Sequence, residues 1–201
     1  MTEELTRRDF VAGSVLTGAV AALMPSVAHA KPLAVPEIDR LSMRVVIDSG
    51  HELFIEKTDH PMVKVERAGL GLIGGSKNLK ALNSQWGLSL HIESTAGDVT
   101  RRQMLDFGST PDVLLNNFAL LKIDPAQLDG LILSHGHADH FGGLVGFVEH
   151  YRASLRPDVE FVAGGEDNFC WQYSKPPGGG DFAEFGVLDR NDLKRLSLPW
   201  S

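Results

Sequence analysis

The sequence predicts one α/β domain in which antiparallel strands come first and strand–helix–strand units follow. Two observations predict it. Short β-branched or alternating apolar segments, bounded by glycine, proline or aspartate, begin near residue 41 and are typical of strands. From residue 111 onward, segments with apolar residues at helical spacing alternate with further short apolar segments.

Residues 1–30 predict an export signal that is not part of the domain. Arg7 and Arg8 precede a charge-free apolar run, residues 11–24, which is shorter than the roughly 20 residues that a membrane-spanning helix needs. Residues 28–30 (AHA) have the small-x-small pattern of a signal-peptidase site. We interpret this segment as a twin-arginine-type signal peptide that is removed after export. An uncleaved amphipathic N-terminus is the alternative.

The remaining residues, 31–201, are the length of one domain. Strands are predicted at residues 41–47, 88–93, 103–107, 130–133 and 159–163. Gly97 and Asp98 predict a turn between the second and third of them. The continuously apolar segment 130–133 (GLIL) is typical of a strand buried on both faces.

Three helices are predicted. Residues 111–121 have apolar residues at helical spacing, with Thr110 as N-cap and a proline at the first helical position. Residues 144–151 form the second helix, and Asp189 or Asn191 begins a last one that runs to about residue 196. Residues 176–180 (PPGGG) predict an irregular loop, and no strand is predicted for residues 198–201.

Charge and cysteine content exclude several classes of function. The net charge of −7 comes without any basic run of the kind that binds nucleic acid or anionic membranes. Cys170 is the single cysteine, so an intramolecular disulfide is excluded, and we expect this side chain to be a small buried hydrophobe. No lipid-anchor cysteine follows the apolar run. The expected protein is periplasmic or secreted, with no stable membrane anchor after signal removal.

Three histidines and one aspartate lie within six residues after the predicted strand 130–133. The segment SHGHADHFGG contains His135, His137, Asp139 and His140. The small residues between them let a bending backbone direct the side chains toward one ion. Imidazole nitrogens and a carboxylate oxygen suit zinc or another borderline divalent ion. The pattern therefore predicts a metal site, and a histidine-rich loop without metal is the alternative.

The segment resembles the HxHxDH signature of the metallo-β-lactamase superfamily. Four further segments are similar to the branch of dihydropterin ribofuranosyl-aminobenzene phosphate synthase-like hydrolases. They are residues 87–90 (GLSL), 105–108 (LDFG), 112–117 (DVLLNN) and 128–137 (LDGLILSHGH). The resemblance covers about residues 41–196. It implies a four-layer αββα sandwich, of which this chain would hold only the N-terminal half to two-thirds.

The resemblance also implies roles for the motif residues. His135 and His137 would hold one metal ion, and Asp139 and His140 a second. Two divalent ions, zinc with manganese or iron as alternatives, would hold a shared hydroxide that attacks the substrate. Asp139 would orient that hydroxide and accept a proton. Asp106 would hydrogen-bond and fix the ligand loop, and a purely structural turn aspartate is the competing interpretation.

The sequence departs from the family pattern after the motif. The family completes its site with a third histidine, a bridging aspartate and a final histidine, whereas no histidine follows His150 here. Asp158, Glu166 and Asp167 are poor substitutes. We expect either a C-terminally truncated enzyme, which we favour, or a site completed by pairing with another chain.

The sequence thus predicts an exported metal-dependent hydrolase of an ester, phosphoester or related small-molecule substrate. A catalytically silent fragment or metal-binding module is the alternative, and β-lactam cleavage ranks below both. The substrate, the metal and the oligomeric state stay open.

Overall fold

The structure is a computed structural model that describes residues 35–50, 59–64, 81–176 and 178–201. The predicted export signal, residues 1–30, lies outside this part of the chain. None of the helices described here has the length and apolar character needed to cross a membrane.

A five-stranded sheet forms the centre of the domain, in the order β1-β4-β5-β6-β7. Its strands are β1 (Arg40–Ile47), β4 (Ser89–Ala96), β5 (Val99–Leu105), β6 (Gly130–Leu133) and β7 (Glu160–Ala163). The first three are antiparallel, and β5, β6 and β7 are parallel. The predicted order, antiparallel strands followed by strand–helix–strand units, is confirmed.

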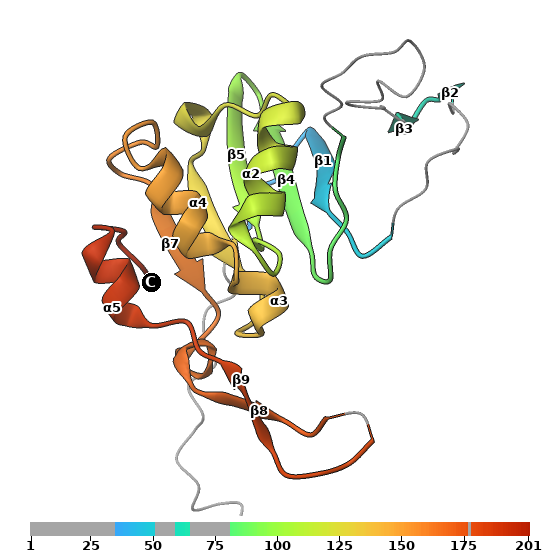
Figure 1. Ribbon diagram of the computed structural model, residues 1–201. Helices are drawn as coiled ribbons and strands as arrows, with labels where there is room; N and C mark the ends of the chain where they lie inside the picture. Colours follow the sequence, from blue (N-terminus) through green and yellow to red (C-terminus); the bar gives the residue numbers. More distant parts are fainter. Residues whose placement is uncertain (1–34, 51–58, 65–80, 177) are drawn as a thin grey trace, which may run out of the picture. The chain divides into compact units, whose positions relative to one another are not determined.

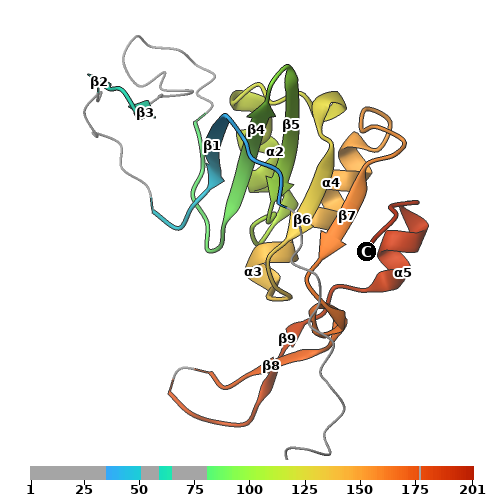
Figure 2. The same ribbon diagram turned by 180° about the vertical axis from the view of Figure 1, so that it is seen from behind.

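Helices α2 (Pro111–Leu120) and α4 (Leu144–Tyr151) cover one face of this sheet (Figures 1 and 2). The other helices are α3 (Ala138–Phe141) and α5 (Arg190–Arg195), with single turns η2 (Pro125–Gln127) and η3 (Glu166–Phe169). Two short hairpins complete the described elements: β2 (Asp59–His60) with β3 (Val63–Lys64), and β8 (Gln172–Ser174) with β9 (Ala183–Gly186).

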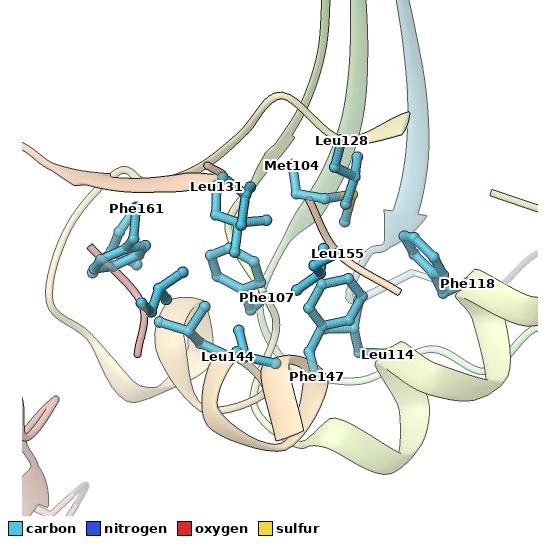
Figure 3. Close-up of a cluster of buried hydrophobic side chains, with 14 of the residues drawn as sticks. Met104, Phe107, Leu114, Phe118, Leu128, Leu131, Leu144, Phe147, Leu155 and Phe161 are labelled. Carbon is cyan, nitrogen blue, oxygen red and sulfur yellow. The ribbon is translucent and has the colours of Figure 1, made fainter. Parts of the chain in front are cut away.

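Aromatic rings fill the space between the sheet and helices α2 and α4 (Figure 3). Phe147 of α4 is fully buried; its ring centroid lies 5.0 Å from that of Phe118 and 6.2 Å from that of Phe107. Phe161 of β7 continues the cluster, 6.4 Å from Phe107. Such tilted and edge-on pairs are favoured by the quadrupoles of the rings. This core holds β5 and β6, whose ends carry the motif, against the helices.

Strand β5 begins and ends earlier than the predicted segment 103–107. Its first residues pair with the end of β4 across a turn in which Gly97 has a φ of 56°. It ends at Leu105 because Asp106 has a φ of 60°, in the left-handed region that interrupts a strand. The end of β5 is therefore fixed by a backbone conformation that alternation alone does not predict.

Thr110 occupies the predicted N-cap position of α2, but its hydroxyl does not cap the helix. It donates instead to Oε1 of Gln85 at 2.9 Å. At the last helix the cap is Asp189, which accepts from the backbone N–H of Asn191. Of the two residues predicted to cap α5, Asp189 is therefore the one that does so.

Three strand pairings were missed, and one of them is the hairpin of β2 and β3. The predicted irregular loop lies between β8 and β9, which pair as an antiparallel hairpin. The tail, for which no strand was predicted, runs parallel to β7: Phe161 donates to the carbonyl of Pro199 and accepts from Ser201. The tail therefore extends the hydrogen bonding of the sheet beyond β7.

The sheet face opposite the helices carries an apolar row. The row crosses all five strands in register: Val45, Leu90, Leu105, Ile132 and Val162. Val45 is 55% exposed and Val162 40%. Ile132 is only partly buried, so the prediction that β6 is buried on both faces was wrong for this side chain.

The expectation that Cys170 is buried was also wrong. Cys170 is exposed, and its thiol contacts the carbonyl of Glu166. Two aromatic side chains are exposed as well: Trp86 by 74% and Trp171 by 57%. Both tryptophans lie in loops outside the core.

Candidate metal centre

The motif residues lie where β5 and β6 end. Parallel neighbours end at the same edge of a sheet, so Asp106 after β5 and Ser134 after β6 are brought side by side. The backbone N–H of Asp106 donates to the carbonyl of Ile132 at 2.9 Å, which continues the pairing to the strand ends. Asp139 and His140 follow in α3.

His135 and His137 form a first pair of donors. Nε2 of His135 lies 3.1 Å from Nδ1 of His137, and the ring planes meet at 73°. The alternation across Gly136 that the sequence predicts thus turns one nitrogen of each ring toward the other.

Asp139 and His140 form a second pair. Oδ2 of Asp139 lies 3.5 Å from Nε2 of His140. The ring of His140 also lies 4.1 Å, centroid to centroid, from that of His135, so the two pairs are neighbours. All four residues predicted as metal ligands are therefore gathered at one place.

The Asp106 carboxylate, 1% exposed, contacts His140 of the second pair and Ser134, the residue before the first pair. Its Oδ2 accepts from Nδ1 of His140 at 2.7 Å and from Oγ of Ser134 at 2.7 Å. Its Oδ1 accepts from the backbone N–H of Ser134 at 2.8 Å. The structure thus places Asp106 in contact with the histidine loop and also gives it a turn conformation, and each of the two interpretations of this residue expects one of these features.

Backbone contacts shape the loop around the motif. A Cβ at Gly136 would lie 2.8 Å from the backbone of Asn168, and a Cβ at Gly142 2.2 Å from the carbonyl oxygen of Ser109. Gly87, with a φ of +114°, is closer still: a Cβ there would lie 1.9 Å from the carbonyl oxygen of Asp139. The small residues are required by neighbouring backbone, in addition to any need to make room for an ion.

The environment of His135 favours its neutral ring. Burial lowers the pKa of His135, and the neighbouring His140 and His137 lower it further. Neutral imidazole is the form that binds a metal ion.

The donors fit a zinc-type ion in chemistry and separation. Two ligand atoms at about 2.0–2.1 Å from a tetrahedral zinc lie about 3.3 Å apart, close to the 3.1 Å and 3.5 Å of the two pairs. The number of donors is smaller than a complete site requires. Among the residues that the structure describes, no group of three or more His, Cys, Asp or Glu side chains is arranged to hold one ion.

Two of the three acidic residues considered as substitutes pair with arginine side chains, and the third, Asp167, is exposed. Asp158 pairs with Arg156 at 2.8 Å, and Glu166 pairs with Arg190. The exposed side chain of His150 lies at the far end of α4, its ring against Tyr151. None of these side chains joins the four motif residues.

Two residues near the motif were missed by the sequence analysis. Ser134 links Asp106 to His135, and its position directly before the first histidine was the available signal. Phe185 of β9 presents its ring edge-on to His137, with 6.1 Å between centroids. No local pattern predicts that contact, because it depends on the unpredicted hairpin.

Known proteins match the chain over its second half. The model of the metallo-beta-lactamase superfamily matches residues 96–199. The 7,8-dihydropterin-6-methyl-4-(beta-D-ribofuranosyl)-aminobenzene-5'-phosphate synthase of Methanocaldococcus jannaschii is 33% identical over 98 residues, 42% of this chain and 33% of that protein. The chain thus spans about a third of the length of this curated relative.

Solved structures give weaker likenesses. The Rm3 metallo-beta-lactamase is 21% identical with a TM-score of 0.30, covering 43% of this chain and 29% of that one. A putative metallo-beta-lactamase from Thermotoga maritima is 17% identical with a TM-score of 0.27, covering 61% and 42%. Because these TM-scores are low, the family assignment rests on the sequence comparisons alone.

Fold and site define an α/β protein with histidine and aspartate side chains gathered at the ends of parallel strands. The family match places it further: the chain belongs to the metallo-β-lactamase superfamily. The fold class predicted from the sequence is confirmed, and so is the resemblance to the dihydropterin ribofuranosyl-aminobenzene phosphate synthase branch.

Proposed function

We propose that this chain is a metal-dependent hydrolase of a small-molecule ester, phosphoester or related substrate. The observation that carries the proposal is the pairing of donors: His135 with His137 at 3.1 Å, and Asp139 with His140 at 3.5 Å. Each pair presents two ligand atoms at the separation that one ion requires. We assign one divalent ion to each pair, zinc with manganese or iron as alternatives.

Each residue has a distinct task in this proposal. When bound, such ions supply positive charge that polarises the scissile group and makes water more acidic. His135, His137 and His140 bind through ring nitrogens and are not proton acceptors. Asp139 orients the attacking water and accepts its proton on a carboxylate oxygen. Asp106 holds the Nδ1 proton of His140, which leaves Nε2 of that ring free to bind.

Metal content of the full chain tests the binding part. Chain purified without chelators and then dialysed against zinc is expected to hold about two ions. His135→Ala should lose the ion at the first pair. His150→Ala is the matched control, because it removes an exposed histidine outside the motif. Equal zinc content in the wild type and in His135→Ala would overturn the proposed site.

Turnover tests the hydrolase part. The curated relative is named a synthase, so hydrolysis has to be measured directly, with nitrophenyl esters and phosphodiesters side by side. Asp139→Asn should bind zinc more weakly and reduce any hydrolysis by at least 100-fold, since a general base contributes about 10²–10⁴-fold. Undiminished turnover in this variant would exclude Asp139 as the base.

A second candidate function is a metal-binding module without catalysis. It is favoured by the number of donors, two at each pair among the described residues, where zinc in proteins has three or four protein ligands. Zinc binding that His135→Ala abolishes, with no turnover of any substrate tested, would support this alternative.

We also propose that the protein is exported folded to the periplasm or beyond. The support is the pair of arginines before the uncharged run of residues 11–24. Replacing Arg7 and Arg8 by lysine should retain the protein in the cytoplasm of an expressing bacterium, as cell fractionation would show. Export that is unaffected by this change would contradict a twin-arginine route.

A further inference from the structure

We infer that Ser134 is a positioning residue through which Asp106 fixes the proton of His135, so that one buried carboxylate prepares both donor pairs. This inference rests on the proposed metal-binding role of the motif. It assigns to Ser134 a role that the signature HxHxDH does not contain. The supporting observations are four hydrogen bonds and the number of protons available for them.

Asp106 accepts at both of its oxygens. As a carboxylate it has no proton to donate. Its Oδ2 lies 2.7 Å from Oγ of Ser134 and 2.7 Å from Nδ1 of His140. Both of these groups must therefore donate to it, and the short distances are those of charge-assisted hydrogen bonds.

The Ser134 hydroxyl has one hydrogen, which Asp106 takes. Oγ of Ser134 also lies 2.9 Å from Nδ1 of His135. With its hydrogen already used, the hydroxyl can only accept in this second bond. His135 must therefore carry its proton on Nδ1, which leaves the lone pair of its Nε2 to accept from Nδ1 of His137 in the metal-free chain.

That lone pair points toward the other nitrogen of the first donor pair. Nε2 of His135 is the atom 3.1 Å from Nδ1 of His137. For the second pair, the direct bond to Asp106 places the proton of His140 on Nδ1 and frees Nε2, the atom nearest Asp139. One carboxylate thus orients His140 directly and His135 through a hydroxyl.

Removing the hydroxyl should release His135 without unfolding the chain. Ser134 is exposed, so Ser134→Ala leaves no buried cavity. Water entering the vacated place could donate to Nδ1 of His135 as readily as accept from it. The ring would then populate both tautomers, and only one of them presents Nε2 for binding.

Nitrogen-15 NMR of the imidazole rings, on the metal-free full chain, measures the tautomer directly. The wild type should show His135 and His140 both protonated on Nδ1. In Ser134→Ala, His135 should become a mixture while His140 is unchanged. Ser134→Thr retains a hydroxyl and should restore the wild-type pattern.

Zinc affinity, measured by competition with a chromophoric chelator, provides a second readout. Loss of a group that orients a ligand weakens metal binding by about 10–100-fold. We expect this loss in Ser134→Ala and recovery in Ser134→Thr. Ser154→Ala, at an exposed serine after α4, is the matched control and should bind zinc like the wild type.

The wild-type spectrum alone can overturn the inference. An Nε2-protonated or mixed His135 would contradict it, and so would a Ser134→Ala variant with an unchanged tautomer and unchanged zinc affinity. Should the chain bind no zinc at all, the proposed function fails. The tautomer of the metal-free protein would still test the relay through Ser134.

Discussion

At the scale of single residues, Asp106 combines a left-handed backbone with four polar contacts. Its φ of 60° ends β5, and its N–H and carboxylate bind Ile132, Ser134 and His140. Asparagine, like aspartate, adopts this conformation more readily than most non-glycine residues. Asp106→Asn therefore isolates the hydrogen bonding from the turn.

Asp106→Asn should keep the fold and weaken metal binding at both pairs. The amide group of asparagine would donate where the carboxylate accepts. The ring nitrogen that carries the proton would therefore change in His135 and His140. Zinc affinity should fall by at least 10-fold at each pair. Chelator competition measures this, with Asp98→Asn in the exposed β4–β5 turn as control; equal affinities for the two variants would contradict the assigned network.

Gly87→Ala should destabilise the fold by about 2 kcal/mol or more. Both a φ of +114° and a Cβ position 1.9 Å from the carbonyl oxygen of Asp139 oppose a side chain there. Gly97→Ala is the matched comparison: its φ is +56°, and nothing lies within 4 Å of the added Cβ. Urea unfolding should show a larger loss for Gly87→Ala, and equal losses would refute the contact with α3.

We predict that the buried His91 makes the stability of the fold depend on pH. It is 5% exposed on β4, and its Nε2 has no hydrogen-bond partner among the residues that the structure describes. Burial lowers the pKa of His91 despite the opposing charge of Glu93, and Arg44 and Arg102 lower this pKa further. Below pH 6.5 the unfolded chain then binds more protons than the folded one, so stability falls as the pH falls. In urea unfolding at pH 5–7, the unfolding free energy of His91→Leu should change less with pH than that of the wild type. An unchanged pH dependence would mean that other groups cause it.

At the scale of elements, the parts best predicted from the sequence were those with a local cause. Strand β6 and helix α4 have the predicted bounds, because each is an apolar segment bordered by glycine or a turn. The hairpin β8–β9 was missed because its strands are three and four residues long and separated by a glycine-rich loop. The pairing of the tail with β7 is a tertiary contact that no local pattern contains.

The same distinction applies to the site. The four motif residues were identified by their spacing, and the structure brings them together at the end of β6. Ser134 was overlooked because serine after a strand is common, and its role depends on Asp106, 28 residues away. The pairing of His137 with Phe185 depends on a hairpin far along the chain.

Packing between α4 and the sheet should dominate the stability of these elements. Phe147 is fully buried among Phe107, Phe118 and Tyr151. Phe147→Ala is expected to cost about 3–5 kcal/mol, whereas Phe182→Ala, at a side chain 67% exposed, should change stability by less than about 0.5 kcal/mol. Thermal and urea unfolding of the two variants provide the comparison; similar losses would place the core elsewhere.

At the scale of the whole molecule, the centre of the described part is a five-stranded sheet with helices α2 and α4 on one face and an apolar row on the other. No described element covers that row. A dye such as anilinonaphthalene sulfonate should therefore bind the folded chain. Val45→Lys, which places a charge in the row, should reduce the dye fluorescence, whereas Val35→Lys, outside the sheet and 78% exposed, should not. Equal fluorescence for the three proteins would indicate that the row is covered.

The glycines around the motif have a consequence for how this sequence can drift over generations. Gly87, Gly136 and Gly142 are confined by backbone atoms of other segments, whereas the histidine rings make contacts that a substitution would lose without a backbone clash. A lineage released from metal binding could exchange its histidines freely and would still have to keep these glycines to fold. In such descendants the histidines would therefore be replaced first, while the surrounding glycines stay unchanged.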